Sequence, residues 1–249
     1  MKKGFTLAEV LITLGIIGVV AALTIPSMVA KHQERERIVK LKKAYGTIQT
    51  AFNTAQFERG DLNTWADGTT GTTGSDNQAV YDNLSPYLKI GKNCGIANNR
   101  DCFPDRVKWL SDSSKETLMR TNLYKFVLND GTAIAWHFPH AGVSMPGHLG
   151  GGPVDTITKC TENITCGYIY VDVNGMKGPN TYGKDVFQFI IFSGTKAVQH
   201  RGTTIWTPFE DTCLANQGTG CAGWVLIHGN MDYLHCPDKI SWNGPYSCK

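Results

Sequence analysis

The sequence is short of net charge and of recognisable catalytic motifs. Its 249 residues include 24 Lys and Arg against 21 Asp and Glu, a formal net charge of +3. So small an excess is not the electrostatic signature of a nucleic-acid-binding protein. GVSMPG is not a G-x-S-x-G nucleophile elbow. His137, His140 and His148 could bind zinc, but no acidic residue completes an H-E-x-x-H motif there. We therefore expect neither an enzyme nor a nucleic-acid-binding protein.

C-x-x-C spacing is also absent, which argues against a thioredoxin-like redox site or a zinc ribbon. The cysteine count is even, which after an export-like segment is typical of disulfides in an oxidising compartment. Eight cysteines allow more than a hundred pairings. We predict that each bonds its nearest neighbour: Cys94 with Cys102, Cys160 with Cys166, Cys213 with Cys221, and Cys236 with Cys248.

The N-terminal segment lacks charge from Val10 to Ile25, and two lysines precede it. Counted from Phe5, the apolar stretch would be about 32 Å long as a helix, close to the ~30 Å hydrocarbon core of a bilayer. A secretory signal peptide is one interpretation, but no clean A-x-A site follows. A plain membrane anchor is a second, and it leaves Glu9 unexplained, because an acidic group in a spanning helix is costly without a partner.

A third interpretation accounts for Glu9. The stretch KGFTLAEVLITLGIIGVVAALTIP resembles the N-terminal segment of the type IV pilin and pseudopilin superfamily. The resemblance implies that a prepilin peptidase cuts between Gly4 and Phe5 and that the new N-terminal Phe5 is methylated. It also implies that Glu9 pairs with the N-terminal amine of a neighbouring subunit during polymerisation. A buried carboxylate beside an ammonium group is tolerated, whereas either one alone is not.

The charges around the anchor conflict with a head that lies outside the cytoplasm. Two lysines precede the apolar segment, whereas six basic residues and two glutamates lie between Lys31 and Lys43. The positive-inside rule would place the bulk of the chain in the cytoplasm. The cysteines and the leader resemblance both place it outside, and we follow these two signals.

The residues after the anchor predict a continuous helix. Apolar residues recur every three or four positions from Ile38 to Ala55, which indicates one buried helix face. Gly60 is a natural stop, and only Pro26 interrupts the preceding run. We expect a leader at 1–4 and then one helix of roughly 50 residues, with a polymerisation half at 5–26 and an amphipathic half at 27–59.

The remaining residues, 60–249, predict a globular head built on an antiparallel sheet. Strands at 124–128 and 132–138 flank an Asn-Asp-Gly turn, as in a hairpin. Further strands are expected at 167–173, 185–192 and 197–200, with a surface loop at 60–77 and a helix at about 221–234. The predicted fold is α+β and pilin-like, with disulfide-stapled loops.

One loop between two predicted strands is a candidate calcium site. By resemblance to an acidic loop that binds calcium in some major pseudopilins, Asp172, Asn174 and Asp185 could supply oxygen ligands, with backbone carbonyls completing the shell. The alternative is structural, since Asp and Asn before Gly are ordinary turn formers. We expect no other cofactor.

These observations predict a structural subunit rather than an enzyme. It would begin as a single-pass inner-membrane protein with its head outside the cytoplasm. It would then enter a periplasmic or cell-surface filament with copies of itself and other pilin-like subunits, through a prepilin peptidase and an inner-membrane assembly platform. A type IV pilus, a type II secretion pseudopilus and a competence filament all remain open. The alternative is a membrane-anchored exported binding domain, either adhesin-like or DNA-capturing, although no nucleic acid is expected.

Overall fold

The computed structural model describes residues 6–65, 73–96, 101–112, 116–118, 123–138, 165–192, 197–200, 202–204, 207–215 and 217–249. The chain divides into two units, Met1–Glu36 and Arg37–Lys249.

Helix α1 (Leu7–Arg59) includes Pro26 without ending there. By length and composition it can cross a membrane, and among the described residues no side chain of its apolar window is buried. The polar side chains in this stretch bond their own helix: the hydroxyls of Thr13 and Thr24 donate to the carbonyls of Glu9 and Val20, each at 2.9 Å. Such backbone bonds satisfy a hydroxyl where no water is present.

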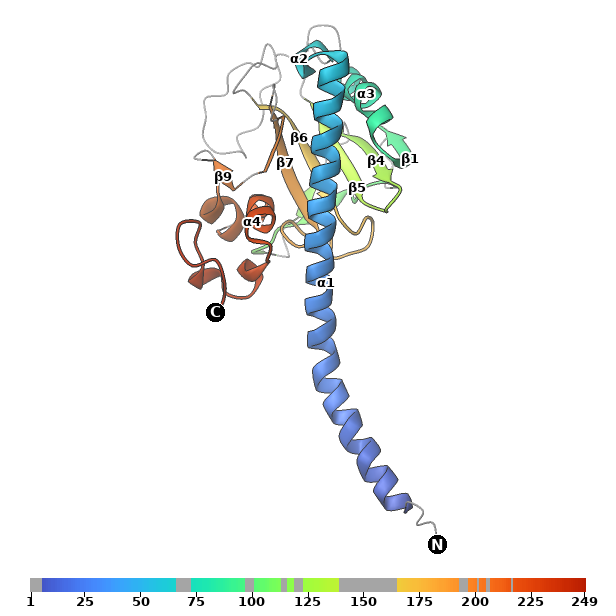
Figure 1. Cartoon of the computed structure of the whole chain (residues 1–249), viewed down its shortest axis with the longest axis vertical. Helices are drawn as coiled ribbons and strands as arrows, with labels where there is room; N and C mark the ends of the chain where they lie inside the picture. The colour runs from blue at the N-terminus through green and yellow to red at the C-terminus, as the bar shows by residue number, and fades with distance from the viewer. Residues whose placement is uncertain are drawn as a thin grey trace. The chain divides into compact units, whose positions relative to one another are not determined.

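The second unit is built on a six-stranded antiparallel sheet in the order β1-β4-β5-β6-β7-β8 (Figure 1). The strands are β1 (Ile90–Gly95), β4 (Tyr124–Leu128), β5 (Ala133–His137), β6 (Thr165–Asp172), β7 (Val186–Phe192) and β8 (Val198–His200). The predicted α+β architecture, with a long helix packed on an antiparallel sheet, is confirmed. In β5 and β6, Trp136 pairs with Ile169, which places both on one face.

That face packs against the second part of α1. Leu41, Ile48 and Phe52 on the helix are buried with Phe126, Trp136 and further apolar side chains of the sheet in one core. Helix α3 (Thr73–Leu84) lies beside α1 over the same face (Figure 1). Its Asn77 is fully buried, and the Asn77 Oδ1 accepts a hydrogen bond from the Phe138 amide at 2.8 Å. The predicted apolar stripe of the helix is therefore its contact with the sheet.

The opposite face of the sheet carries a smaller core. Phe103 and Val107 cover Ala133, Ala135 and Val186 there. Short strands β2 (Arg106–Lys108) and β3 (Glu116–Leu118) pair beside this region. Lys125 of β4 is only 3% exposed on this side, and its burial lowers the pKa of its ammonium group.

The C-terminal region is compact and disulfide-linked. It contains β9 (Thr203–Thr204), β10 (Thr207–Pro208), a π-helix η2 (Glu210–Leu214), α4 (Cys221–His228), and the 3₁₀ turns η3 (Asp232–Leu234) and η4 (Pro237–Lys239). Three of the predicted cysteine pairs lie within the described residues, and all three are bonded. Cys166 is also disulfide-bonded, while its predicted partner Cys160 lies outside the described residues.

Several sequence-based boundaries were wrong. The helix expected at 221–234 ends at His228, because Gly229 adopts a left-handed conformation with φ 70° and caps it. The expected loop at 60–77 contains α2 (Leu62–Trp65) and the first turn of α3. The 3₁₀ turn η1 (Ser85–Tyr87) follows α3 at Pro86, whereas strand β1 was not predicted.

Candidate functional sites

The start of α1 holds a capping box made by Thr6 and Glu9. A Glu9 carboxylate oxygen accepts hydrogen bonds from the backbone amide and the hydroxyl of Thr6, both at 2.8 Å. In return, the Glu9 amide donates to the Thr6 hydroxyl at 3.3 Å. This reciprocal arrangement satisfies amide groups that a helix start leaves unpaired. The T-x-x-E spacing could have identified Thr6 from the sequence, where only Glu9 was singled out.

Gly4 and Phe5, the predicted processing residues, lie outside the described residues. Phe5 is bonded directly to Thr6, so a cut before Phe5 would leave the new amine one residue from the cap. Glu9 follows Phe5 by four residues, about one helical turn. The carboxylate is thus held at the end of the helix where the new amine would form.

The candidate calcium residues come together at one end of the sheet. Asp172 ends β6, Asp185 directly precedes β7, and both are 0% exposed. Asn174 contacts both of them. Its backbone N–H donates to Asp172 Oδ1 at 3.1 Å, and its side-chain Nδ2 donates to Asp185 Oδ2 at 3.2 Å. The three residues predicted from the sequence therefore form one cluster.

Backbone amides hold the Asp185 carboxylate in place. Thr181 donates to its Oδ1 at 2.7 Å, and Asn180 donates to its Oδ2 at 2.9 Å. The chain must turn tightly to reach this geometry. Gly175 has φ +68°, and a Cβ at that position would lie 2.8 Å from the Gly131 carbonyl. Only glycine fits both requirements at low cost.

The two buried carboxyl groups are difficult to ionise together. The pKa of Asp172 is raised to about 8, first by burial and then by the nearby Asp185, against the backbone amides of Asn174 and Gly175 and the charge of Arg37. Burial also raises the pKa of Asp185. Two carboxyl groups that share a low-dielectric site favour keeping a proton or gaining a cation.

The residues present suit a hard cation in ligand type. Calcium takes oxygen ligands, and the cluster offers two carboxylates and the side-chain oxygen of Asn174, which is buried and has no hydrogen-bond partner among the described residues. The amide bonds to Asp172 and Asp185 equally suit the turn-former alternative. The unpaired Asn174 oxygen is what the turn alone does not explain.

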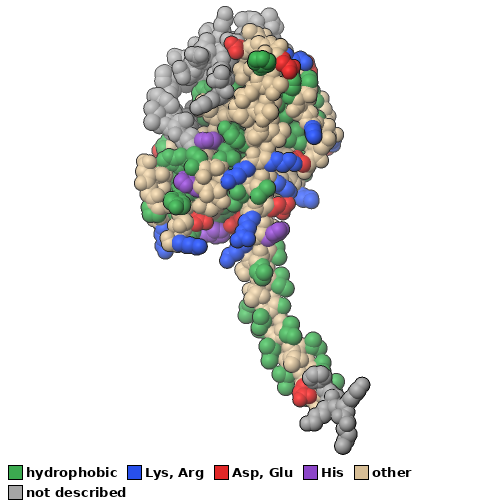
Figure 2. Space-filling view, viewed as in Figure 1, with side chains coloured by type: hydrophobic (Ala, Val, Ile, Leu, Met, Phe, Trp, Pro, Cys, Tyr) green, Lys and Arg blue, Asp and Glu red, His purple; other side chains and the backbone are tan. Residues whose placement is uncertain are grey.

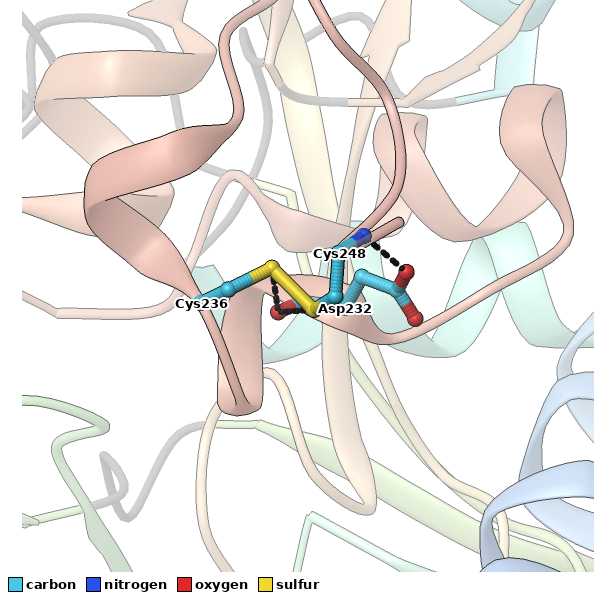
Figure 3. Close-up of side chains that lie close together, drawn as sticks. All are labelled: Asp232, Cys236 and Cys248. Atoms are coloured by element: carbon cyan, nitrogen blue, oxygen red, sulfur yellow. Dashed lines mark hydrogen bonds between the residues drawn. A yellow bond between two sulfur atoms is a disulfide. The ribbon is translucent and has the colours of Figure 1, made fainter.

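A second cluster of potential ligands contains the Cys236–Cys248 disulfide. Asp232, Cys236 and Cys248 bring one ligand atom each within 4.8 Å of one another. Figure 3 shows that the two sulfur atoms are bonded to each other, and the Asp232 carboxylate accepts a hydrogen bond from the Cys248 amide at 2.8 Å. Because the sulfurs are not thiolates, this group fastens the C-terminal tail and is not a zinc centre.

Of the three histidines considered as zinc ligands in the sequence, only His137 lies within the described residues. His137 is buried in β5, where it pairs with Tyr168 of β6. His140 and His148 lie outside the described residues.

Comparison with known proteins identifies the N-terminal segment. Residues 1–25 match the family model described as the prokaryotic N-terminal methylation motif, the prepilin-type signal of type IV pilins and pseudopilins. The match confirms the resemblance drawn from Gly4, Phe5 and Glu9. No curated protein and no solved structure matches the chain.

Proposed function

We propose that the chain is the precursor of a filament subunit of the pilin or pseudopilin type. The observation that carries this proposal is the combination of a methylation motif at residues 1–25 with a helix that continues into an α+β head. The motif supports a pilin-like precursor, and the apolar part of α1 fits a membrane-anchored one. A structural role follows more naturally from these features than a catalytic one.

In the proposed mechanism, a prepilin peptidase removes residues 1–4 and frees the amine of Phe5. Glu9 then exchanges its bonds to Thr6 for the amine of an adjacent subunit. In hydrocarbon a carboxylate and an ammonium group tolerate burial only as a pair, so the exchange favours association over the isolated subunit. The capping box keeps Glu9 hydrogen-bonded until a neighbour arrives.

A pair of variants tests this mechanism in native cells. We expect Glu9→Ala to be processed normally, because the cut lies on the other side of Phe5, but to be lost from sheared filaments. Glu34→Ala removes an acidic side chain of the same helix beyond the apolar stretch and should assemble as the wild type does. Mass spectrometry should show that both variants begin at a methylated Phe5.

The opposite results would refute the proposal. An intact Met1, or a start near Lys31, would exclude prepilin processing. Normal incorporation of Glu9→Ala would exclude the pairing. If the processed wild type also stayed monomeric in the membrane, the anchored binding-domain alternative would be favoured. Retention of full ligand binding by a head without residues 1–30 would support that alternative directly.

We further propose that Asp172, Asn174 and Asp185 hold calcium in the assembled protein. Calcium would displace the proton that the raised pKa of Asp172 retains at neutral pH. Calorimetric titration of the chain should show uptake that Asp185→Asn weakens at least about tenfold, since one of two charged ligands is lost. Asp238→Asn, an exposed acid elsewhere, is the matched control. Absence of uptake by the wild type would leave the turn-former role alone.

A further inference from the structure

The basic segment that follows the apolar part of α1 contains two kinds of cation. Two of its later members have acidic neighbours in the second unit: Lys43 forms a 2.7 Å ion pair with Asp130, and Arg37 lies close enough to Asp172 and Asp185 to influence their pKa values. The positive charges of Lys43 and Arg37 are therefore directed at acidic groups of the second unit.

Lys31 and Arg35 differ from them. Both side chains are exposed. Across the described ranges of the chain, neither takes part in an ion pair or a hydrogen bond. They are four residues apart and so lie one turn apart on the same face of the helix. Of the two acids in the segment, Glu36 lies at least about 100° from both side chains around the helix axis, and Glu34 lies about 60° from Lys31, at the i,i+3 position.

Their position relative to the apolar stretch is well defined, because both belong to the same unit and the same helix. The uncharged stretch runs from Val10 to Ala30, and Lys31 follows immediately. Figure 2 shows hydrophobic side chains along the first part of α1 and Lys and Arg side chains over the part that follows. Leu7–Ala30 would measure about 36 Å as a helix, slightly more than a ~30 Å hydrocarbon core.

With the N-terminus in the cytoplasm, Lys31 and Arg35 would meet the headgroups on the exported side. Long basic side chains extend from a helix end to the polar layer. A lysine and an arginine one turn apart provide a point charge and a planar fork of donors, both of which suit phosphate oxygens. Because they oppose the positive-inside rule, their charges do not serve orientation.

We propose that Lys31 and Arg35 bind the headgroups of anionic phospholipids on the exported face of the membrane. The proposal rests on the proposed function, since it needs an anchored precursor. The contact fixes the depth of the anchor before assembly and must be broken when the subunit leaves the bilayer for a filament. The surface charge of the bilayer itself is the binding partner, rather than an isolated phosphate.

The test uses the full chain in phosphatidylcholine vesicles containing phosphatidylglycerol. Spin-labelled lipids of each headgroup report which lipid is held at the protein surface. We expect preference for phosphatidylglycerol of roughly threefold or more at low salt, falling towards onefold at high salt as the charges are screened. Lys31→Gln/Arg35→Gln should lose most of this preference. Lys31→Arg/Arg35→Lys should keep it.

The matched control is Lys239→Gln/Lys249→Gln, which removes the same two positive charges from exposed C-terminal positions. It should keep the preference. An equal loss in this control would show that only net charge matters and would overturn the proposal. So would an unchanged preference in Lys31→Gln/Arg35→Gln, which would point to another contact. Inorganic phosphate should compete no better than chloride at equal ionic strength, and stronger competition would show that an isolated phosphate is the ligand.

The anchor is checked separately by an alkaline carbonate wash of the same vesicles. A chain that washes out would overturn both the anchored-precursor function and this inference. A chain that stays in the bilayer without preferring phosphatidylglycerol would overturn the inference alone.

Discussion

The substitution Asp172→Asn should remove a pH dependence of stability that the buried carboxyl pair creates. The pKa of Asp172 rises from 3.8 to about 8 on folding, mainly because of burial. Between these values the unfolded chain has lost the proton and the folded chain still holds it. Stability therefore falls as pH rises through this window, by up to about 1.4 kcal/mol per pH unit for one proton.

The stabilising contribution is fully present below pH 3.8 and is lost by about pH 8. The raised pKa of Asp185 acts in the same direction. Asparagine keeps an oxygen that can accept from the Asn174 amide but carries no ionisable group. Asp172→Asn should therefore be the more stable protein near pH 8, with a shallower slope below it.

Guanidinium unfolding of a head fragment, residues 31–249, measures the free energy of unfolding of wild type and variant between pH 5 and 8.5, with the disulfides intact. The fragment contains the whole compact unit from Arg37 onward. Asp238→Asn, which changes an exposed carboxylate, should leave the wild-type slope in place. Parallel stability curves for wild type and Asp172→Asn would refute the reasoning. Calcium should flatten the wild-type curve, because it favours the ionised pair.

Three further variants test the packing of the head by the midpoint of denaturant unfolding. Asn77→Ala should cost about 1–3 kcal/mol, because it leaves the buried Phe138 amide without its acceptor, whereas Asn77→Asp should retain most of the stability. Lys125→Met should stabilise the protein by about 1 kcal/mol, since burial disfavours the charged ammonium and methionine is of similar size; a loss of stability would show that its polar contacts outweigh desolvation. Cys236→Ala/Cys248→Ala should cost about 2–3 kcal/mol and speed amide exchange in residues 229–249, and unchanged exchange would contradict the fastening role of this disulfide.

Regular periodicity is what allowed the main elements to be predicted. The three-and-four spacing from Ile38 to Ala55 indicates a buried helix face, and the structure buries Leu41, Ile48 and Phe52 on it. Strands β4 and β5 are marked by the Asn-Asp-Gly turn between them. In both cases the local sequence and the tertiary contacts favour the same conformation.

Elements that depend on their neighbours were missed. Strand β1 contains Gly91, Lys92 and Asn93, which show no apolar alternation, and it forms by pairing with β4 at the edge of the sheet. The π-helix η2 contains Cys213, which is bonded to Cys221 at the start of α4. Such conformations follow from contacts that no short window of sequence contains.

The candidate sites show the same division. An acidic residue in an apolar run drew attention to Glu9, and resemblance to the pilin and pseudopilin superfamily suggested its role and the set of Asp172, Asn174 and Asp185. Sequence reasoning did not reveal that both carboxyl groups of the cluster are fully buried, or that the side-chain oxygen of Asn174 has no hydrogen-bond partner in the part of the chain that the structure describes. Those facts depend on how the loop folds over the end of the sheet, and they determine its affinity for a proton or a cation.

The two acidic sites share a physical logic, although they belong to different units. Each has a carboxyl group in surroundings that solvate charge poorly: hydrocarbon for Glu9 in the proposed anchor, and the protein interior for Asp172. Each also has a provisional partner, the Thr6 cap in one case and a retained proton in the other. Such a partner stabilises the carboxyl group in the isolated subunit, yet the partner binds weakly enough to be displaced by a stronger cation. An amine from a neighbouring subunit, or a calcium ion, would then contribute free energy to assembly that the isolated precursor cannot obtain from its own residues.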